Sequence, residues 1–134
     1  MNMNNEQKNT WVKRQITAAL LNLLKEKKLA DISVSELTEM AGVGRVSFYR
    51  NYQTKEDILR EESDRLIQEW GKLYEANPES APETLFPSLF DFYREHRDFY
   101  TTLYEAGMST IMMDTIISTI QITPEMPNLE AYMK

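Results

Sequence analysis

The chain has 134 residues, no cysteine, one histidine and a formal net charge of −6. The missing cysteines exclude disulfide bonds, and His96 alone cannot build a zinc site. The polar N-terminus lacks the apolar core of a signal peptide, and no apolar run approaches the roughly 20 residues that span a bilayer. We therefore expect a soluble cytoplasmic protein that contacts no membrane and uses no cofactor.

The charge is unevenly distributed along the chain. Residues 1–60 carry ten Lys or Arg against seven Asp or Glu, a balance of +3, whereas residues 61–134 carry five against fourteen, a balance of −9. A mildly basic N-terminal part followed by an acidic part suits a DNA-reading head joined to a domain that does not touch DNA.

The first predicted helix covers residues 10–28, where apolar residues recur every three or four positions. Its apolar face comprises Val12, Ile16, Ala19, Leu20, Leu23 and Leu24. The KEKK cluster (residues 25–28) would place positive charge on the last turn, where the helix dipole favours it.

Two short helices around a tight turn are predicted next. Ser33 and Glu36 form an S-x-x-E capping box that should start a helix, and Gly42 can adopt the positive φ that ends it. The apolar face of this helix comprises Leu37, Met40 and Ala41. A second helix should run from residue 44 to residue 50 with Phe48 facing inward, which completes a helix-turn-helix pattern.

A long helix is predicted over residues 55–76, because Thr54 and Asp57 form another capping signal and Asn77-Pro78 supplies the next breaker. Further helices are predicted near residues 82–94, 99–106 and 108–120, with Asp98 as a cap and a last turn from Leu129. The fold class is all-α: a three-helix head (1–54) joined through the connector helix 55–76 to a helical regulatory domain (55–134).

The stretch 33–55 resembles the DNA-binding signature of the TetR (tetracycline-repressor-like) family of bacterial regulators. The resemblance is carried by Ala41-Gly42-Val43, Ser47-Phe48-Tyr49, Tyr52 and Thr54-Lys55-Glu56. It implies a homodimeric transcriptional regulator, more often a repressor, that binds a double-stranded DNA operator under the control of a small-molecule effector. Thr38 departs from the usual alanine, and Asn51 from a common histidine.

Carried over by position, the resemblance implies that Arg45, Val46 and Ser47 face base edges in the major groove. It implies contacts with DNA phosphates by Ser33, Tyr49, Asn51 and Lys55. The side-chain chemistry agrees, because an arginine fork can pair with guanine, valine methyls can meet a thymine methyl, and a small serine allows close approach. Arg45 could instead be a solvated surface residue that contacts no base. Tyr49 could be a half-buried spacer that contacts no phosphate.

An effector pocket is predicted between the long helix and the helices after it, because ligand pockets are mostly apolar with a few polar groups. Its candidate lining comprises Trp70, Tyr74, Phe86, Phe90, Tyr93, Phe99, Tyr100, Tyr104, Met112 and Met113. Aromatic and methionine residues at helical spacing are also ordinary core residues, so we expect this set to divide between pocket and core.

Chains of the TetR family usually continue with two further helices that form the dimer interface. We therefore expect the regulatory domain in residues 55–134 to be incomplete, and the sequence leaves open whether this chain dimerises. The alternative function is a helical protein-interaction module that does not read DNA sequence. An enzyme has no support, since we find no thiol, metal cluster, phosphate-binding glycine loop or evident nucleophile.

Overall fold

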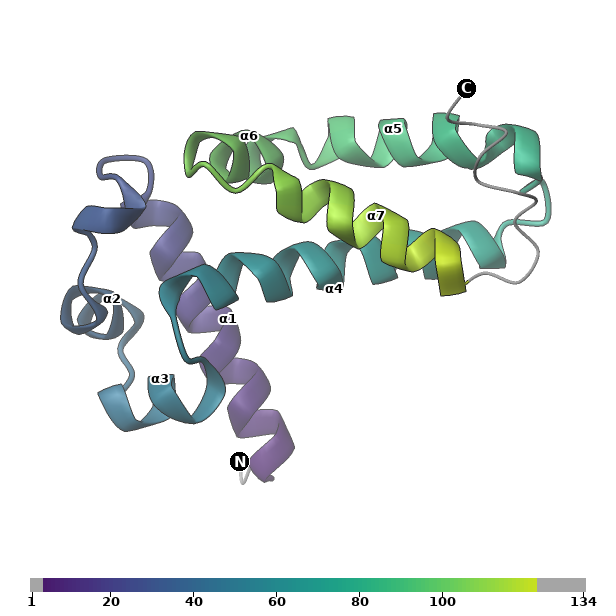
Figure 1. The fold of residues 1–134 in the computed structure, drawn as a ribbon. Helices are drawn as coiled ribbons and strands as arrows, with labels where there is room; N and C mark the ends of the chain where they lie inside the picture. Colours follow the sequence, from purple (N-terminus) through teal and green to yellow (C-terminus); the bar gives the residue numbers. More distant parts are fainter. Residues whose placement is uncertain (1–3, 123–134) are drawn as a thin grey trace. The chain divides into compact units, whose positions relative to one another are not determined.

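The computed structural model describes residues 4–122, with side chains to residue 117, and is helical with no strand in that range (Figure 1). The elements are α1 (Asn5–Leu23), the short 3-10 helix η1 (Leu29–Asp31), α2 (Val34–Ala41), α3 (Arg45–Asn51), α4 (Lys55–Ala76), the 3-10 helix η2 (Pro82–Thr84), α5 (Leu85–Glu95), α6 (Arg97–Glu105) and α7 (Thr110–Ile122). The predicted all-α class is confirmed. The chain divides into two compact units, with the boundary between Glu62 and Ser63.

Helix α1 begins at Asn5, earlier than predicted, because Asn4 caps it. The Asn4 Oδ1 atom accepts the Gln7 backbone N–H at 2.8 Å, and the Gln7 side chain accepts the Asn4 N–H at 3.0 Å. This N-x-x-Q capping box is wholly polar, so a search for apolar periodicity misses it. The helix ends at Leu23, so the predicted placement of the KEKK cluster on its last turn is wrong.

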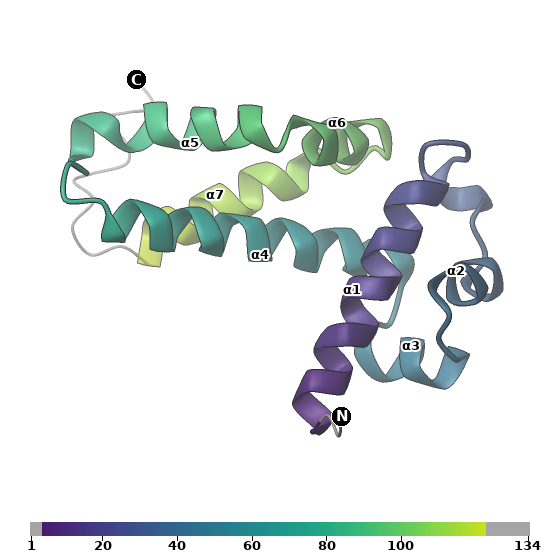
Figure 2. The same cartoon turned by 180° about the vertical axis from the view of Figure 1, so that it is seen from behind.

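The core of the first unit forms where α1 packs along α2 and α3 (Figures 1 and 2). Six of its side chains have an exposed fraction of 0%: Ile16, Leu20, Leu37, Phe48, Ile58 and Leu59. Since Ile58 and Leu59 belong to the first turns of α4, these turns pack with the head, and the compact unit runs to Glu62. Met40, predicted on the apolar face of α2, is instead 53% exposed.

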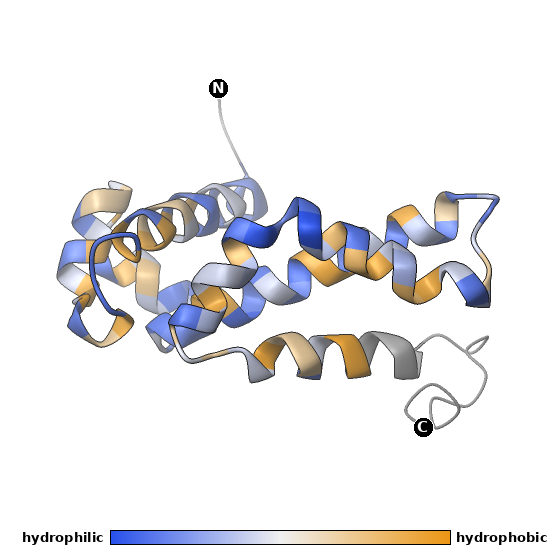
Figure 3. Ribbon diagram, turned by 90° about the horizontal axis from the view of Figure 1, so that it is seen from above, coloured by the Kyte–Doolittle hydropathy of each residue, from blue (hydrophilic) through white to orange (hydrophobic). Residues whose placement is uncertain are grey.

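The second unit contains the remaining turns of α4 with α5, α6 and α7. Its buried core comprises Leu66, Ile67, Trp70, Leu85, Leu89 and Phe92. Helix α5 runs beside α4, and α7 lies along one side of this pair and is coloured as largely apolar (Figures 1 and 3). The buried hydroxyls of Ser63 and Thr115 lie 3.5 Å apart and join α4 to α7.

The predicted bounds of the long helix, 55–76, are confirmed, and the later helices are displaced by about two residues from their predicted limits. Asp98 lies in the first turn of α6, and His96 occupies the cap position instead. Gly107 has a φ of 77° and follows the end of α6, as predicted. The predicted last turn from Leu129 lies outside the described residues.

Candidate nucleic-acid interface

Helices α2 and α3 form a hairpin whose turn depends on a left-handed residue. Gly42 has a φ of 72°, a conformation that side chains with a Cβ rarely adopt, and it ends α2 as predicted. The N–H groups of Gly42 and Val43 then donate to Glu39 O and Thr38 O at 3.2 and 3.0 Å. These bonds satisfy the last carbonyls of α2 and turn the chain into α3.

The start of α2 has one half of the predicted capping box. Ser33 Oγ accepts the Glu36 N–H at 3.0 Å, as predicted. The Glu36 carboxylate does not reach back to the Ser33 N–H in this structure; it accepts two bonds from Lys27 Nζ, at 2.7 and 2.9 Å. With Lys27 the carboxylate makes two bonds to a full positive charge, whereas the Ser33 N–H would offer one bond to a neutral donor.

Thr38, the departure from the usual alanine, is accommodated inside its own helix. Its side chain is 4% exposed, and its hydroxyl lies 2.9 Å from Val34 O and 3.2 Å from Ser35 O. A buried hydroxyl that donates within its own helix carries no unpaired donor, so the helix tolerates the polar group.

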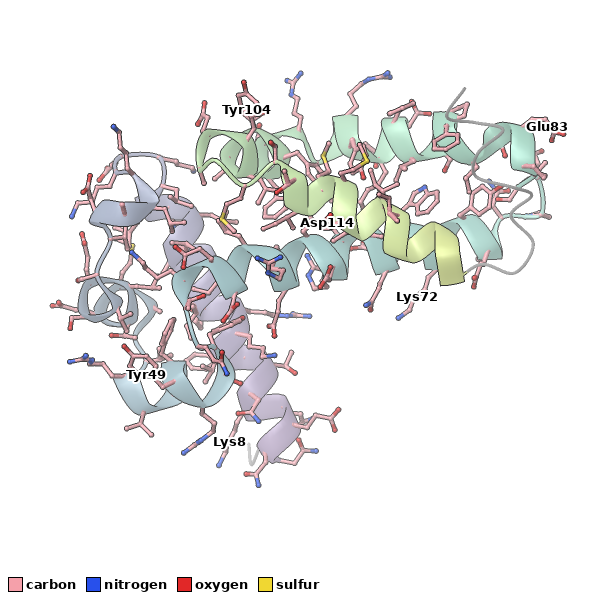
Figure 4. All side chains as sticks on the ribbon, in the orientation of Figure 1. Lys8, Tyr49, Lys72, Glu83, Tyr104 and Asp114 are labelled. Atoms are coloured by element: carbon pink, nitrogen blue, oxygen red, sulfur yellow. The ribbon has the colours of Figure 1, made fainter. Side chains whose placement is uncertain are left out.

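The exposed side of α3 carries the predicted base-reading residues. Arg45 is exposed and Val46 is 72% exposed, whereas Phe48 is fully buried and Ser47 is half-buried at the edge of the exposed side. Tyr49, labelled on α3 in Figure 4, is 53% exposed, and the edge of its ring meets Phe48 at a centroid distance of 5.0 Å. No acidic residue lies on α3, so its exposed side suits a polyanion.

Sequence analysis missed Arg50. At 100° per residue, Arg50 lies between Val46 and Ser47 around the helix and one turn further along it. The side chain is exposed, and it adds a second cation to α3 on the side that carries Val46. The spacing of Arg50 from Val46, one helical turn, could have revealed it from the sequence. The family signature does not include this position.

Two predicted phosphate ligands already make bonds within the protein. Asn51 Nδ2 donates to Ser47 O at 2.8 Å, which leaves the second N–H of the amide for another acceptor. Lys55 Nζ donates to Leu29 O at 2.7 Å and to Ile32 O at 2.6 Å. An ammonium has three N–H donors, so one remains.

The N-terminus of α4 is capped in both directions, as Thr54 and Asp57 predict. The Asp57 N–H donates to Thr54 Oγ1 at 3.3 Å, and Asp57 Oδ2 accepts the N–H groups of Gln53 and Thr54 at 3.1 and 3.0 Å. The carboxylate therefore occupies part of the end of α4 that a DNA phosphate would approach.

A cluster at the end of α3 connects this helix to α1 and α4. Lys13 Nζ lies 3.1 Å from Glu61 Oε2 and 5.6 Å from the centre of the Tyr52 ring, which is 4% exposed. Burial raises the pKa of Tyr52 to about 12; the Glu61 and Glu62 carboxylates add to this shift, and a hydrogen bond with Thr17 opposes it.

Alkaline solution is expected to destabilise the first unit through Tyr52. Because its folded pKa of about 12 exceeds the unfolded value of about 10, the neutral phenol contributes stability below about pH 10 that is lost as the pH rises toward 12. Urea unfolding between pH 8 and pH 11.5 should show a shallower loss for Tyr52→Phe than for the parent chain. The exposed Tyr49, changed to Phe, is the matched control and should leave the parent's loss unchanged; an equal slope for Tyr52→Phe contradicts the assignment.

The second unit has an open cleft of about 460 Å³ near the end of α4 and the start of α5. Its lining comprises Trp70, Leu73, Tyr74, Asn77, Thr84, Pro87, Ser88, Asp91, Phe92 and Glu95. The Trp70 indole N–H donates to Ser88 Oγ at 3.0 Å, and the Trp70 and Tyr74 rings stack at 5.5 Å. Two carboxylates, Asp91 and Glu95, and no lysine or arginine are among these described lining residues, and Asp91 Oδ1 also accepts a bond from the Arg94 guanidinium at 3.3 Å.

The ten predicted pocket residues have different environments. Trp70 and Tyr74 line this cleft. Trp70 also belongs to the buried core, and the residues that pack against this core are Tyr74, Phe86, Tyr93, Phe99 and Tyr100. The exposed ones are Phe90 (57%), Tyr104 (72%) and Met113 (55%), and Met112 is half-buried. Tyr104, labelled in Figure 4, points away from the neighbouring helices.

The described residues show no helix that is long and apolar enough to cross a membrane. Within the same part of the chain, no group of three or more His, Cys, Asp or Glu side chains could hold a metal ion.

Residues 4–62 thus build a helix-turn-helix domain with a cationic, acid-free outer helix. Residues 16–61 match the family described as "Bacterial regulatory proteins, tetR family". Residues 16–61 therefore form a regulatory domain of the TetR family.

The chain is also similar to curated helix-turn-helix regulators of transcription. The chain is 31% identical over 101 residues to an uncharacterized HTH-type transcriptional regulator, YxbF, of Bacillus subtilis, covering 69% of this chain and 26% of the relative. It is 41% identical over 54 residues to the HTH-type transcriptional regulator EthR of Mycobacterium tuberculosis, covering 40% of this chain and 25% of the relative. It is 37% identical over 67 residues to EthR of Mycolicibacterium smegmatis, covering 50% of this chain and 31% of the relative. The matches span about a quarter to a third of these relatives.

Proposed function

We propose that this chain is a sequence-specific DNA-binding regulator of transcription whose helix α3 lies in the major groove. The observation that carries the proposal is the exposure of Arg45 and Val46 at the start of α3, the helix that Phe48 anchors in the core. Arg45 pairs with guanine, the Val46 methyls meet thymine, and Ser47 lets α3 approach the bases closely. Arg50 extends this reading surface by one turn.

Contacts with DNA phosphates would position α3 in the groove. Tyr49 has an exposed ring whose hydroxyl can donate, Ser33 can donate its hydroxyl hydrogen while its oxygen caps α2, and Asn51 has one amide N–H remaining. Lys55 brings a positive charge to the same region of the first unit. Such contacts set affinity and register but carry no sequence information.

The match to the TetR family supports three finer proposals: the protein represses transcription, a small-molecule effector controls it, and it forms a homodimer. As a homodimer, the protein would place two α3 helices in successive major grooves, about 34 Å apart or a multiple of that distance. Binding of a small molecule to the second unit would change this separation and so release the operator. A cytoplasmic location follows, since the operator is in that compartment.

The cleft of the second unit indicates which effectors to test first. Its volume of about 460 Å³ suits a small molecule, its lining includes the aromatic rings of Trp70, Tyr74 and Phe92, and the carboxylates of Glu95 and of the Arg94-paired Asp91 favour a positive charge. In a Trp11→Phe variant, which leaves Trp70 as the one tryptophan of the chain, aromatic cations should quench the fluorescence more than matched aromatic anions do. Asp91→Asn with Glu95→Gln should remove this preference, and equal quenching by both classes contradicts it.

Selection of duplex sites from a random library tests the proposal as a whole. The chain should enrich a short motif that contains guanine, and a dimer should enrich two copies at the spacing of one helical turn. The double variant Arg45→Ala with Val46→Ala, altered only at exposed positions, should fold normally and lose the motif. Binding that is weak and equal on all sequences would instead favour the interaction module.

A further inference from the structure

Lys55 connects two segments of the first unit that are far apart in the sequence. Its ammonium donates to carbonyl oxygens of Leu29 and Ile32, which lie 26 and 23 residues earlier in the chain, at 2.7 and 2.6 Å. The bonds are partly buried, and the side chains of Leu29 and Ile32 are 8% and 1% exposed. The ammonium is therefore held against a backbone that the core fixes from the other side.

Lys55 is the first residue of α4, where its positive charge is unfavourably placed. A cation at the first residue of a helix is disfavoured by the helix dipole. The ammonium of Lys55 lies instead against the carbonyls of Leu29, which also accepts the Ile32 N–H at 3.2 Å, and of Ile32, which caps the C-terminal end of η1, where a cation is favoured. The carbonyls thus compensate for the unfavourable position of the charge in its own helix.

The two carbonyls lie next to the start of α2. Ile32 immediately precedes Ser33, which caps α2 through its 3.0 Å bond to the Glu36 N–H. Anything that holds the carbonyl of Ile32 therefore holds the entry of the chain into the helix-turn-helix hairpin. Two of the three N–H donors of Lys55 serve this purpose, and one remains for solvent or a phosphate.

We infer that Lys55 is a positioning residue, which fixes the start of α2 against the start of α4 and so sets the orientation of the DNA-reading hairpin. The inference rests on the proposed function for its effect on DNA binding, but its structural part does not depend on DNA. It assigns Lys55 a role different from that of a simple phosphate ligand, and the two roles have separable consequences.

The test uses Lys55→Met, which keeps the length of the side chain but removes its charge and donors, with the exposed Lys25, changed to Met, as a matched loss of one charge. Without DNA, Lys55→Met should lower the midpoint of thermal unfolding by several degrees and speed amide hydrogen exchange in residues 29–41 by at least about tenfold. Lys25→Met should change neither. An unchanged midpoint with unchanged exchange overturns the inference, whether or not the chain binds DNA.

The dependence of DNA binding on salt separates the two roles further. Removing a phosphate contact weakens binding equally on all sequences and reduces the slope of log K against log salt by about 1. Removing a positioning residue should in addition lower the ratio of affinity for the selected operator to affinity for random duplex by about tenfold or more. Uniform weakening with the smaller slope overturns the inference.

Lys55→Arg covers the case in which Lys55→Met does not fold. A guanidinium binds phosphate at least as well as an ammonium, but its planar fork does not fit two carbonyls that converge on one nitrogen. The variant should therefore lower the unfolding midpoint and the operator preference. Parent-like values of both for Lys55→Arg overturn the inference. Failure of the proposed function shows separately, as a lack of sequence preference in the parent chain.

Discussion

Replacing Phe48 by alanine is expected to lower the free energy of unfolding of the first unit by roughly 3 to 5 kcal/mol. Phe48 is fully buried, and its ring contacts Tyr49 and Tyr52 at centroid distances of 5.0 and 5.9 Å. The truncation removes a large apolar surface and leaves a cavity between helices that are already closely packed. Because small domains are stable by only about 5 to 15 kcal/mol, much of the first unit's stability would be lost.

Urea unfolding followed by circular dichroism measures this loss. The neighbouring Tyr49, changed to Ala, is the control, because its side chain is 53% exposed and its removal should cost far less. Similar losses for the two variants would show that Phe48 does not anchor α3. The DNA affinity of Phe48→Ala should fall only because less of the chain is folded.

Replacing Arg45 by alanine is expected to weaken binding to the selected operator by roughly 1 to 3 kcal/mol. The side chain is exposed on α3, so the variant should unfold at the same urea concentration as the parent. Arg14 is exposed on α1 and serves as the control for a lost charge. If Arg14→Ala and Arg45→Ala weaken DNA binding equally, on the operator and on random duplex, then Arg45 makes only a general electrostatic contact and does not read a base.

The sequence predicts the fold well where local signals agree with packing. The Thr54 and Asp57 cap, the Asn77-Pro78 breaker and the apolar face between them gave the bounds of α4, and Gly42 gave the end of α2. Predictions are wrong where a side chain had two possible partners. The Glu36 carboxylate binds Lys27, nine residues earlier, because a capping motif does not include competing cations at a distance.

The candidate site is less predictable than the fold because its contacts are long-range. The bonds from Lys55 to carbonyl oxygens near residue 30 leave no pattern in the local sequence, so the family signature suggests only a phosphate ligand. Helical spacing also cannot separate a pocket from a core. Tyr93 and Tyr74 lie at equivalent-looking apolar positions, yet Tyr93 packs against the core while Tyr74 also lines the cleft.

A double-mutant cycle tests the central claim, that α3 reads bases through Arg45. Parent and Arg45→Ala chains are measured on the selected operator and on the same operator with its guanine pair replaced, at one fixed salt concentration. We predict that each single change costs roughly 1 to 3 kcal/mol and that the second change adds little once the first is made, because both remove one contact. Strictly additive losses would contradict direct reading of that base by Arg45.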